Sequence, residues 1–151
     1  LMTMRASEGS HLKKDTLDRL SILENEAKLI ETHAPSVLLR YRENLHKRLA
    51  ESGLELDLTD ERLLKEIGLF AEKCDISEEL TRLASHFLKF REYLDVAGDQ
   101  PVGRSLDFLC QELNREFNTI GSIANDATLA QHVVNAKTEL EKIREQIQNV
   151  E

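Results

Sequence analysis

Two stretches of the sequence combine residue types that could perform acid–base or metal chemistry. In the first, Glu79 and His86 are seven residues apart, which places them on one flank of a helix with Arg82 between them. If Asp107 and Glu112 approach from a neighbouring helix, these groups could bind a divalent metal ion or transfer protons. Alternatively, Glu79 and Arg82 form a surface ion pair and His86 lies at the edge of the core. The spacing leaves both interpretations open, because it is not the HExxH pattern of metalloproteases.

The second stretch, residues 103–120, is predicted to form a helix with two unlike faces. At about 3.6 residues per turn, one stripe is apolar, as a core-facing helix requires: Leu106, Leu109, Cys110, Leu113, Phe117 and Ile120. Another arc carries side chains that form directed hydrogen bonds: Arg104, Asp107, Gln111, Asn114, Arg115 and Asn118. This polar arc could be a solvated structural network or a ligand-binding surface.

A short basic strip lies elsewhere in an acidic chain. The net charge of -8 argues against broad, non-specific nucleic-acid binding by the whole chain, since that needs clustered cations. Residues 40–48 nevertheless concentrate Arg40, Arg42, Lys47 and Arg48. No glycine-rich phosphate loop or nucleophile elbow is present, so kinase and serine-hydrolase chemistry are not supported.

Composition indicates a helical protein of the cytoplasm. The 151 residues include only 6 Gly and 2 Pro, which leaves few helix breakers. No apolar run approaches the roughly 18 residues of a membrane span, and the first residues lack a signal-peptide pattern. Cys74 and Cys110 are isolated thiols without CxxC spacing, so they predict neither a zinc site nor a disulfide framework.

Apolar spacing predicts an all-α fold of about six helices, arranged as antiparallel hairpins with long, coiled-coil-like helices. Pro35 is expected to separate a helix over residues 2–33 from one over residues 36–52. These two would form a long helical hairpin over residues 1–53. A linker at 54–58 would lead to a second unit, a four-helix domain over residues 54–151.

Capping signals mark the helix boundaries in that second unit. Asp60 is a candidate N-cap, and Asp75 with Glu78 fits a capping box. Residues 98–103 combine two Gly and a Pro and are the clearest predicted break. Asp126 is a candidate cap for the last helix.

Several segments resemble, in the same order, the C-terminal half of the YicC family of bacterial endoribonucleases. They include Met-Arg-Ala-Ser-Glu-Gly at 4–9, Asp-Ile-Ser-Glu-Glu-Leu-Thr-Arg-Leu at 75–83, Ser-His at 85–86, the stretch 101–122, Ala-Asn-Asp at 124–126, and 144–151. Long motifs in a shared order are specific. The chain departs from the family pattern at Ile123, where relatives commonly have Lys, so a cation that could contact phosphate is lost there.

The resemblance implies a bacterial, cytoplasmic, metal-dependent endoribonuclease of a family first labelled stress-induced. It implies homo-oligomers, including a hexamer of the full-length protein, and an N-terminal domain that this chain lacks. The candidate catalytic residues are His86, Asp107, Glu112 and Gln111, and the candidate ligands for Mg²⁺ or Mn²⁺ are Glu79, Asp107 and Glu112. The candidate RNA contacts are Arg82, Arg104, Arg115 and Asn118, together with Arg40, Arg42, Lys47 and Arg48.

Two other functions remain open from the sequence. The chain could be an oligomerisation scaffold, with the RNA chemistry in the N-terminal domain, or an acidic helical adaptor for another protein. The scaffold predicts a stable oligomer without RNA binding, whereas the endoribonuclease predicts RNA cleavage that depends on the candidate residues.

Overall fold

The computed structural model describes residues 2–54, 57, 59–96 and 103–150, and the regular secondary structure within these ranges is entirely helical. The helices are α1 (Met2–Glu51), α2 (Glu61–Lys73), α3 (Ser77–Val96), α4 (Gly103–Ala124) and α5 (Ala127–Val150). The all-α prediction is confirmed, but these ranges hold five helices instead of about six. None of the described helices combines the length and the apolar character needed to cross a membrane.

The difference in helix number comes from Pro35, which lies inside α1 instead of ending a helix. The expected hairpin over residues 1–53 is therefore wrong. A proline removes one backbone hydrogen bond and crowds the preceding turn. Here Pro35 is exposed, so water can satisfy the carbonyl that loses its donor. Ile30 and Val37, on either side of it, are buried in the same core, and this packing holds both segments in one helix.

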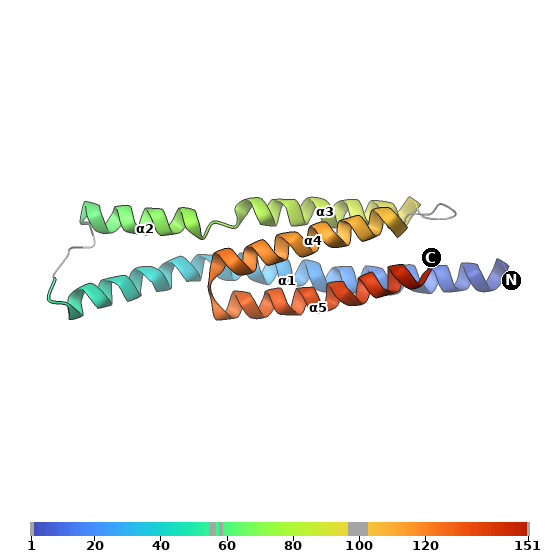
Figure 1. Ribbon diagram of the computed structural model, residues 1–151, viewed down its shortest axis with the longest axis horizontal. Coiled ribbons are helices and arrows are strands. Elements are labelled where there is room, and N and C mark those ends of the chain that lie inside the picture. Colours follow the sequence, from blue (N-terminus) through green and yellow to red (C-terminus); the bar gives the residue numbers. More distant parts are fainter. Residues whose placement is uncertain (1, 55–56, 58, 97–102, 151) are drawn as a thin grey trace.

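Helices α1, α3, α4 and α5 surround one hydrophobic core (Figure 1). Helices α3 and α5 run antiparallel to α1 and α4, so each of α3–α4 and α4–α5 is a pair of antiparallel neighbours (Figure 1). The apolar stripe predicted on α4 is buried in this core, as are Leu129, Val133, Ala136, Leu140, Ile143 and Ile147 of α5. Because α1 contributes Leu20, Leu23 and Ile30 to it, residues 1–53 share their core with the second expected unit.

Beyond Val37, α1 extends past the start of α5 and pairs with α2 (Figure 1). We call residues 38–51 and 61–73 the α1–α2 arm. The rings of Tyr41 and Phe70 stack across it with centroids 3.6 Å apart. No side chain between residues 38 and 51 is buried, and α2 buries only Leu63. The arm is therefore held by a thinner apolar contact than the four-helix core.

Three of the predicted helix caps are present, with one difference. Asp60 accepts a hydrogen bond from the Arg62 N–H at the start of α2, and Asp126 accepts one from the Leu129 N–H at the start of α5. Asp75 accepts the Ser77 N–H before α3, but Glu78 pairs with Arg82 instead of completing the capping box. The predicted break at 98–103, apart from Gly103, and part of the 54–58 linker lie outside the described residues.

Candidate functional site

An imidazole and two carboxylates converge between α3 and α4. One ligand atom each from His86, Glu112 and Glu116 lies within 4.8 Å of the other two. Glu116 is buried, and His86 and Glu112 are partly buried. We call these three residues the His–Glu–Glu cluster. Such a set of donors can bind a divalent cation or exchange protons with a substrate.

Helix geometry and core packing position the cluster. Glu112 and Glu116 are four residues apart and so lie about 40° from each other around α4. Phe117 follows directly in the core, and Phe87 follows His86 on α3. Both phenylalanines are buried, so the helix faces that carry the cluster cannot rotate apart without exposing the core.

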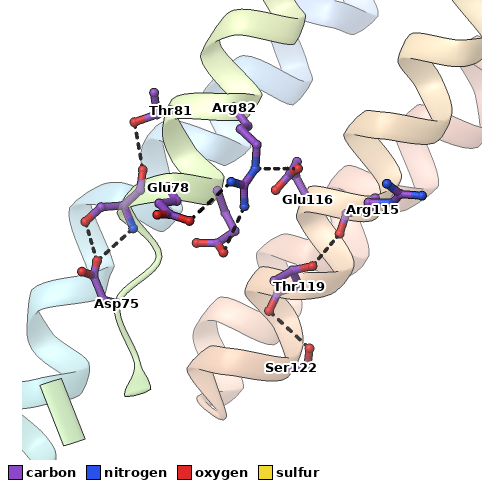
Figure 2. A network of polar contacts seen from close by, with 10 residues as sticks. Asp75, Glu78, Thr81, Arg82, Arg115, Glu116, Thr119 and Ser122 are labelled. Atoms are coloured by element: carbon purple, nitrogen blue, oxygen red, sulfur yellow. Dashed lines mark hydrogen bonds and ion pairs between the residues drawn. The ribbon is translucent and has the colours of Figure 1, made fainter. Parts of the chain in front are cut away.

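Arg82 connects the cluster to two further carboxylates (Figure 2). Its Nε donates to Glu116 Oε1 at 2.9 Å, across the α3–α4 interface. Its Nη2 and Nη1 donate to Glu79 Oε1 at 3.3 Å and Glu78 Oε2 at 3.4 Å, on its own helix. The hydrogen bond to Glu116 is the main cause of a raised Arg82 pKa.

Two buried polar atoms near these residues have no hydrogen-bond partner among the described residues: Glu79 Oε2 and His86 Nε2. Leaving a buried donor or acceptor unpaired costs about 1–3 kcal/mol, and native structures keep few such groups. Unpaired atoms of this kind are suited to bind a ligand. The Glu79 side chain is only 10% exposed, so it cannot turn to solvent without a rearrangement of its neighbours.

Asp107 and Gln111, both predicted as catalytic, lie on another side of α4. Gln111 donates to Asp107 Oδ2 at 3.0 Å, and Arg144 of α5 donates to Asp107 Oδ1 at 3.3 Å. The reason is geometric: Asp107 and Glu112 are five residues apart, so they point about 140° away from each other. The structure therefore brings Glu112 and His86 together but does not bring Asp107 to them.

The rest of the polar arc of α4 includes one contact with α5 and two exposed arginines. Asn118 accepts a hydrogen bond from Lys137 of α5 at 2.6 Å, which adds to the α4–α5 contact made by Asp107. Arg104 is exposed, and Arg115, with 73% of its side chain exposed, lies 3.7 Å from Glu112. Ile123, where the resemblance leads us to expect Lys, packs against the core.

Arg42, Lys47 and Arg48 of the basic strip are exposed on the α1–α2 arm. Arg40 differs, because its Nη1 donates to Asp126 Oδ1 at 3.1 Å while 58% of its side chain stays exposed. The same aspartate contacts His33 Nε2 through Oδ2 at 3.0 Å. Asp126 thus ties α1 to the start of α5 on both sides of Pro35.

Sequence reasoning missed Glu116 as a site residue. The signal was available, since Glu112 and Glu116 form a carboxylate pair four residues apart, and such residues share one face of a helix. What the sequence does not contain is the rotation of α4 that turns this pair toward α3. The revised cluster keeps two predicted residues, His86 and Glu112, and adds this one.

Comparisons with known proteins show the family to which this chain belongs. The family described as "Endoribonuclease YicC-like, C-terminal" matches residues 30–151. The chain is 43% identical over 152 aligned residues to the "Probable endoribonuclease YicC" of Clostridioides difficile (strain 630), with 100% of this chain and 51% of that protein covered. It is 38% identical over 150 residues to the protein of the same name in Haemophilus influenzae, with 99% and 51% covered. The chain spans about half the length of these curated relatives, and it belongs to the family of YicC-like endoribonuclease C-terminal domains.

Proposed function

We propose that this chain is the C-terminal part of a metal-dependent endoribonuclease and that the His–Glu–Glu cluster is its metal site. The observation that carries the proposal is the convergence of His86, Glu112 and Glu116 at an interface where His86 Nε2 is buried and unpaired. RNA as the substrate is supported by the names of the two relatives.

The donor set fits a divalent transition metal. Carboxylate oxygens suit Mg²⁺ and Mn²⁺, whereas an imidazole suits transition metals better than Mg²⁺, so we favour Mn²⁺ of the two expected cofactors. His86, Glu112 and Glu116 would hold the ion, whereas Glu79 is linked to Glu116 because both accept hydrogen bonds from Arg82. When bound, such an ion supplies Lewis-acid polarisation of a phosphate and a lowered pKa for water.

The surrounding side chains have separate tasks in this proposal. Arg115 is exposed and 3.7 Å from Glu112, so its guanidinium can bind a phosphate oxygen next to the cluster. Arg82 holds Glu116 in place from α3. Asp107 and Gln111 are left out of the proposed site, because Asp107 accepts hydrogen bonds from both Gln111 and Arg144 on another side of α4.

Phosphate affinity in an acidic chain must come from local groups of cations. Arg42, Lys47 and Arg48 on the α1–α2 arm, with Arg104 and Arg115 on α4, are exposed and available for this task. A cytoplasmic location and a homo-oligomer are part of the same proposal, carried by the family resemblance. The scaffold alternative is less favoured, because the metal-binding residue types converge in this half of the relatives' length.

Direct metal binding tests the site. Isothermal titration of the chain with Mn²⁺ should show one site, and His86→Ala or Glu116→Gln should weaken binding by at least about tenfold, the loss seen even when residues supporting a metal ligand are removed. His46→Ala, an exposed histidine on α1, and Asp107→Asn are matched controls that should bind like the wild type. Equal affinity in the wild type and both cluster variants would refute the site.

Cleavage of a labelled single-stranded RNA tests the activity. We expect cutting that needs Mn²⁺, stops with EDTA and is strongly reduced by Glu116→Gln. Metal binding without cleavage would place the RNA chemistry outside this chain, as the scaffold alternative predicts.

A further inference from the structure

We propose that Arg82 is the resident counter-ion of the His–Glu–Glu cluster and competes with a divalent cation for Glu116. The inference rests on the proposed metal site. It states that the Arg82 guanidinium pairs with Glu116 when no metal is bound. Arg82 is then a positioning residue that sets the metal affinity of the site.

The contacts of Arg82 support this competition. Its three guanidinium nitrogens each face a different carboxylate, and only the bond to Glu116 crosses from α3 to α4. Glu116 is at once the closest partner of Arg82, at 2.9 Å, and a member of the cluster. A cation bound to this carboxylate would share it with, or take it from, the guanidinium (Figure 2).

The excess of negative charge around the cluster also favours a divalent cation. Four carboxylates, Glu78, Glu79, Glu112 and Glu116, face two guanidinium groups, Arg82 and Arg115, so these six side chains carry two more negative than positive charges. One bound divalent cation would neutralise this excess. Arg82 neutralises part of it when the ion is absent, because a buried carboxylate such as Glu116 needs a partner.

Arg82 has an alternative arrangement on its own helix. Glu78 and Glu79 precede it by four and three residues, the spacing at which helical side chains meet. Glu79 Oε2 is buried and has no partner among the described residues, so it can accept a second hydrogen bond from the guanidinium. If Arg82 lost its contact with Glu116, its guanidinium would therefore still be paired with Glu78 and Glu79.

The substitution Arg82→Gln removes the competing charge but keeps an amide that can donate to Glu116. It should tighten Mn²⁺ binding by roughly tenfold, the size of a Coulomb interaction between a single and a double charge about 5 Å apart in water. Arg82→Lys keeps the charge and should stay near the wild-type affinity. Arg91→Gln is the matched control, since Arg91 lies on the same helix but pairs with Glu24 of α1.

A measurement on the unaltered chain gives a second readout. The side-chain Nε–H signal of Arg82, assigned by its disappearance in Arg82→Lys, should shift when diamagnetic Zn²⁺ is added, because its acceptor is Glu116. The Arg91 Nε–H signal should not move. An unchanged Arg82 signal at saturating Zn²⁺ would overturn the competition.

The two proposals fail in different ways. Wild-type Mn²⁺ binding that depends on His86, with unchanged or weaker affinity in Arg82→Gln, overturns the role of Arg82 and leaves the metal site standing. Binding that is absent, or that does not depend on His86, in both the wild type and Arg82→Gln overturns both. Tighter binding in Arg82→Gln, with no change in Arg91→Gln, supports the inference.

Discussion

Asp126→Ala should destabilise the chain strongly, because one carboxylate serves three partners. It caps α5 through the Leu129 N–H at 3.0 Å, contacts His33 at 3.0 Å and accepts from Arg40 at 3.1 Å. Its side chain is only 5% exposed, so water cannot replace these partners without local opening. The substitution removes a helix cap and two links between α1 and α5 together.

The expected cost can be summed from these contacts. Loss of an N-cap costs about 1 kcal/mol, and a partly buried hydrogen bond to His33 contributes about 1 kcal/mol. The Arg40 pair is worth only about 0.5 kcal/mol, since most of that arginine is exposed. The total of about 2.5 kcal/mol corresponds to a melting temperature lower by roughly 5–10 °C for a chain of this length.

Thermal and urea unfolding followed by circular dichroism measure this loss. Asp126→Asn separates the helix cap from the contacts with His33 and Arg40, because asparagine is as good an N-cap but carries no charge. This variant should therefore lose about 1.5 kcal/mol of the free energy of unfolding. Asp60→Ala is the matched control: it removes another aspartate cap, at the start of α2, whose partner Arg62 is 82% exposed. If Asp126→Ala costs no more than Asp60→Ala, the reasoning is refuted.

The charge of Asp126 also predicts a pH dependence. Burial alone would raise its pKa, but the Leu129 N–H, His33 and Arg40 outweigh burial and lower the pKa below 3.8. A group with a lowered folded-state pKa stabilises the fold above its unfolded pKa and loses this effect as the pH falls. The stability difference between the wild type and Asp126→Asn should therefore be full at pH 5 and shrink as the pH falls below 3.8. A constant difference down to pH 3 would contradict this assignment.

Two further substitutions and one labelling experiment test the core. Phe117→Ala should lower the free energy of unfolding in urea by about 3–5 kcal/mol, because Phe117 is fully buried. Phe108→Ala should lower it little, because Phe108 is 57% exposed. Similar losses in the two variants would contradict the packing. Burial raises the pKa of the Cys110 thiol to about 12, so a thiol reagent at pH 8 should label Cys74 well before Cys110. Equal labelling rates by mass spectrometry in the folded chain would exclude this burial.

The sequence predicts helices α2 to α5 well but predicts α1, the longest of the described helices, poorly. Apolar spacing located α2 to α5 and the buried face of α4, because each pattern reflects packing against a neighbour. The local preference of a proline predicts that a helix ends at Pro35. The structure overrides that preference through the burial of Ile30 and Val37 in the shared core and through the contacts of Asp126. The core partners on other helices and Asp126 are distant in sequence, so a local window cannot reveal them.

The sequence predicts two of the three residues of the His–Glu–Glu cluster, because the third depends on tertiary packing. Residue type predicts His86 and Glu112 as site residues, and both lie in the cluster. Residue type also favours Asp107, but its five-residue separation from Glu112 places it on another face of the helix. Glu116 required knowledge of which side of α4 faces α3, and that depends on the tertiary packing of Phe117 and its neighbours.

The long helix α1 belongs to two regions of unequal stability. Between Leu20 and Val37 the buried apolar side chains of α1 lie in the four-helix core, whereas residues 38–51 bury none and contact α2 and, through Arg40, Asp126. Opening of the distal part exposes little apolar surface, so it costs much less free energy than unfolding of the core. Amide protection should consequently fall along a single unbroken helix, with the change just beyond Pro35, so that the exposed cations Arg42, Lys47 and Arg48 lie on a segment that can unwind while the cluster stays folded.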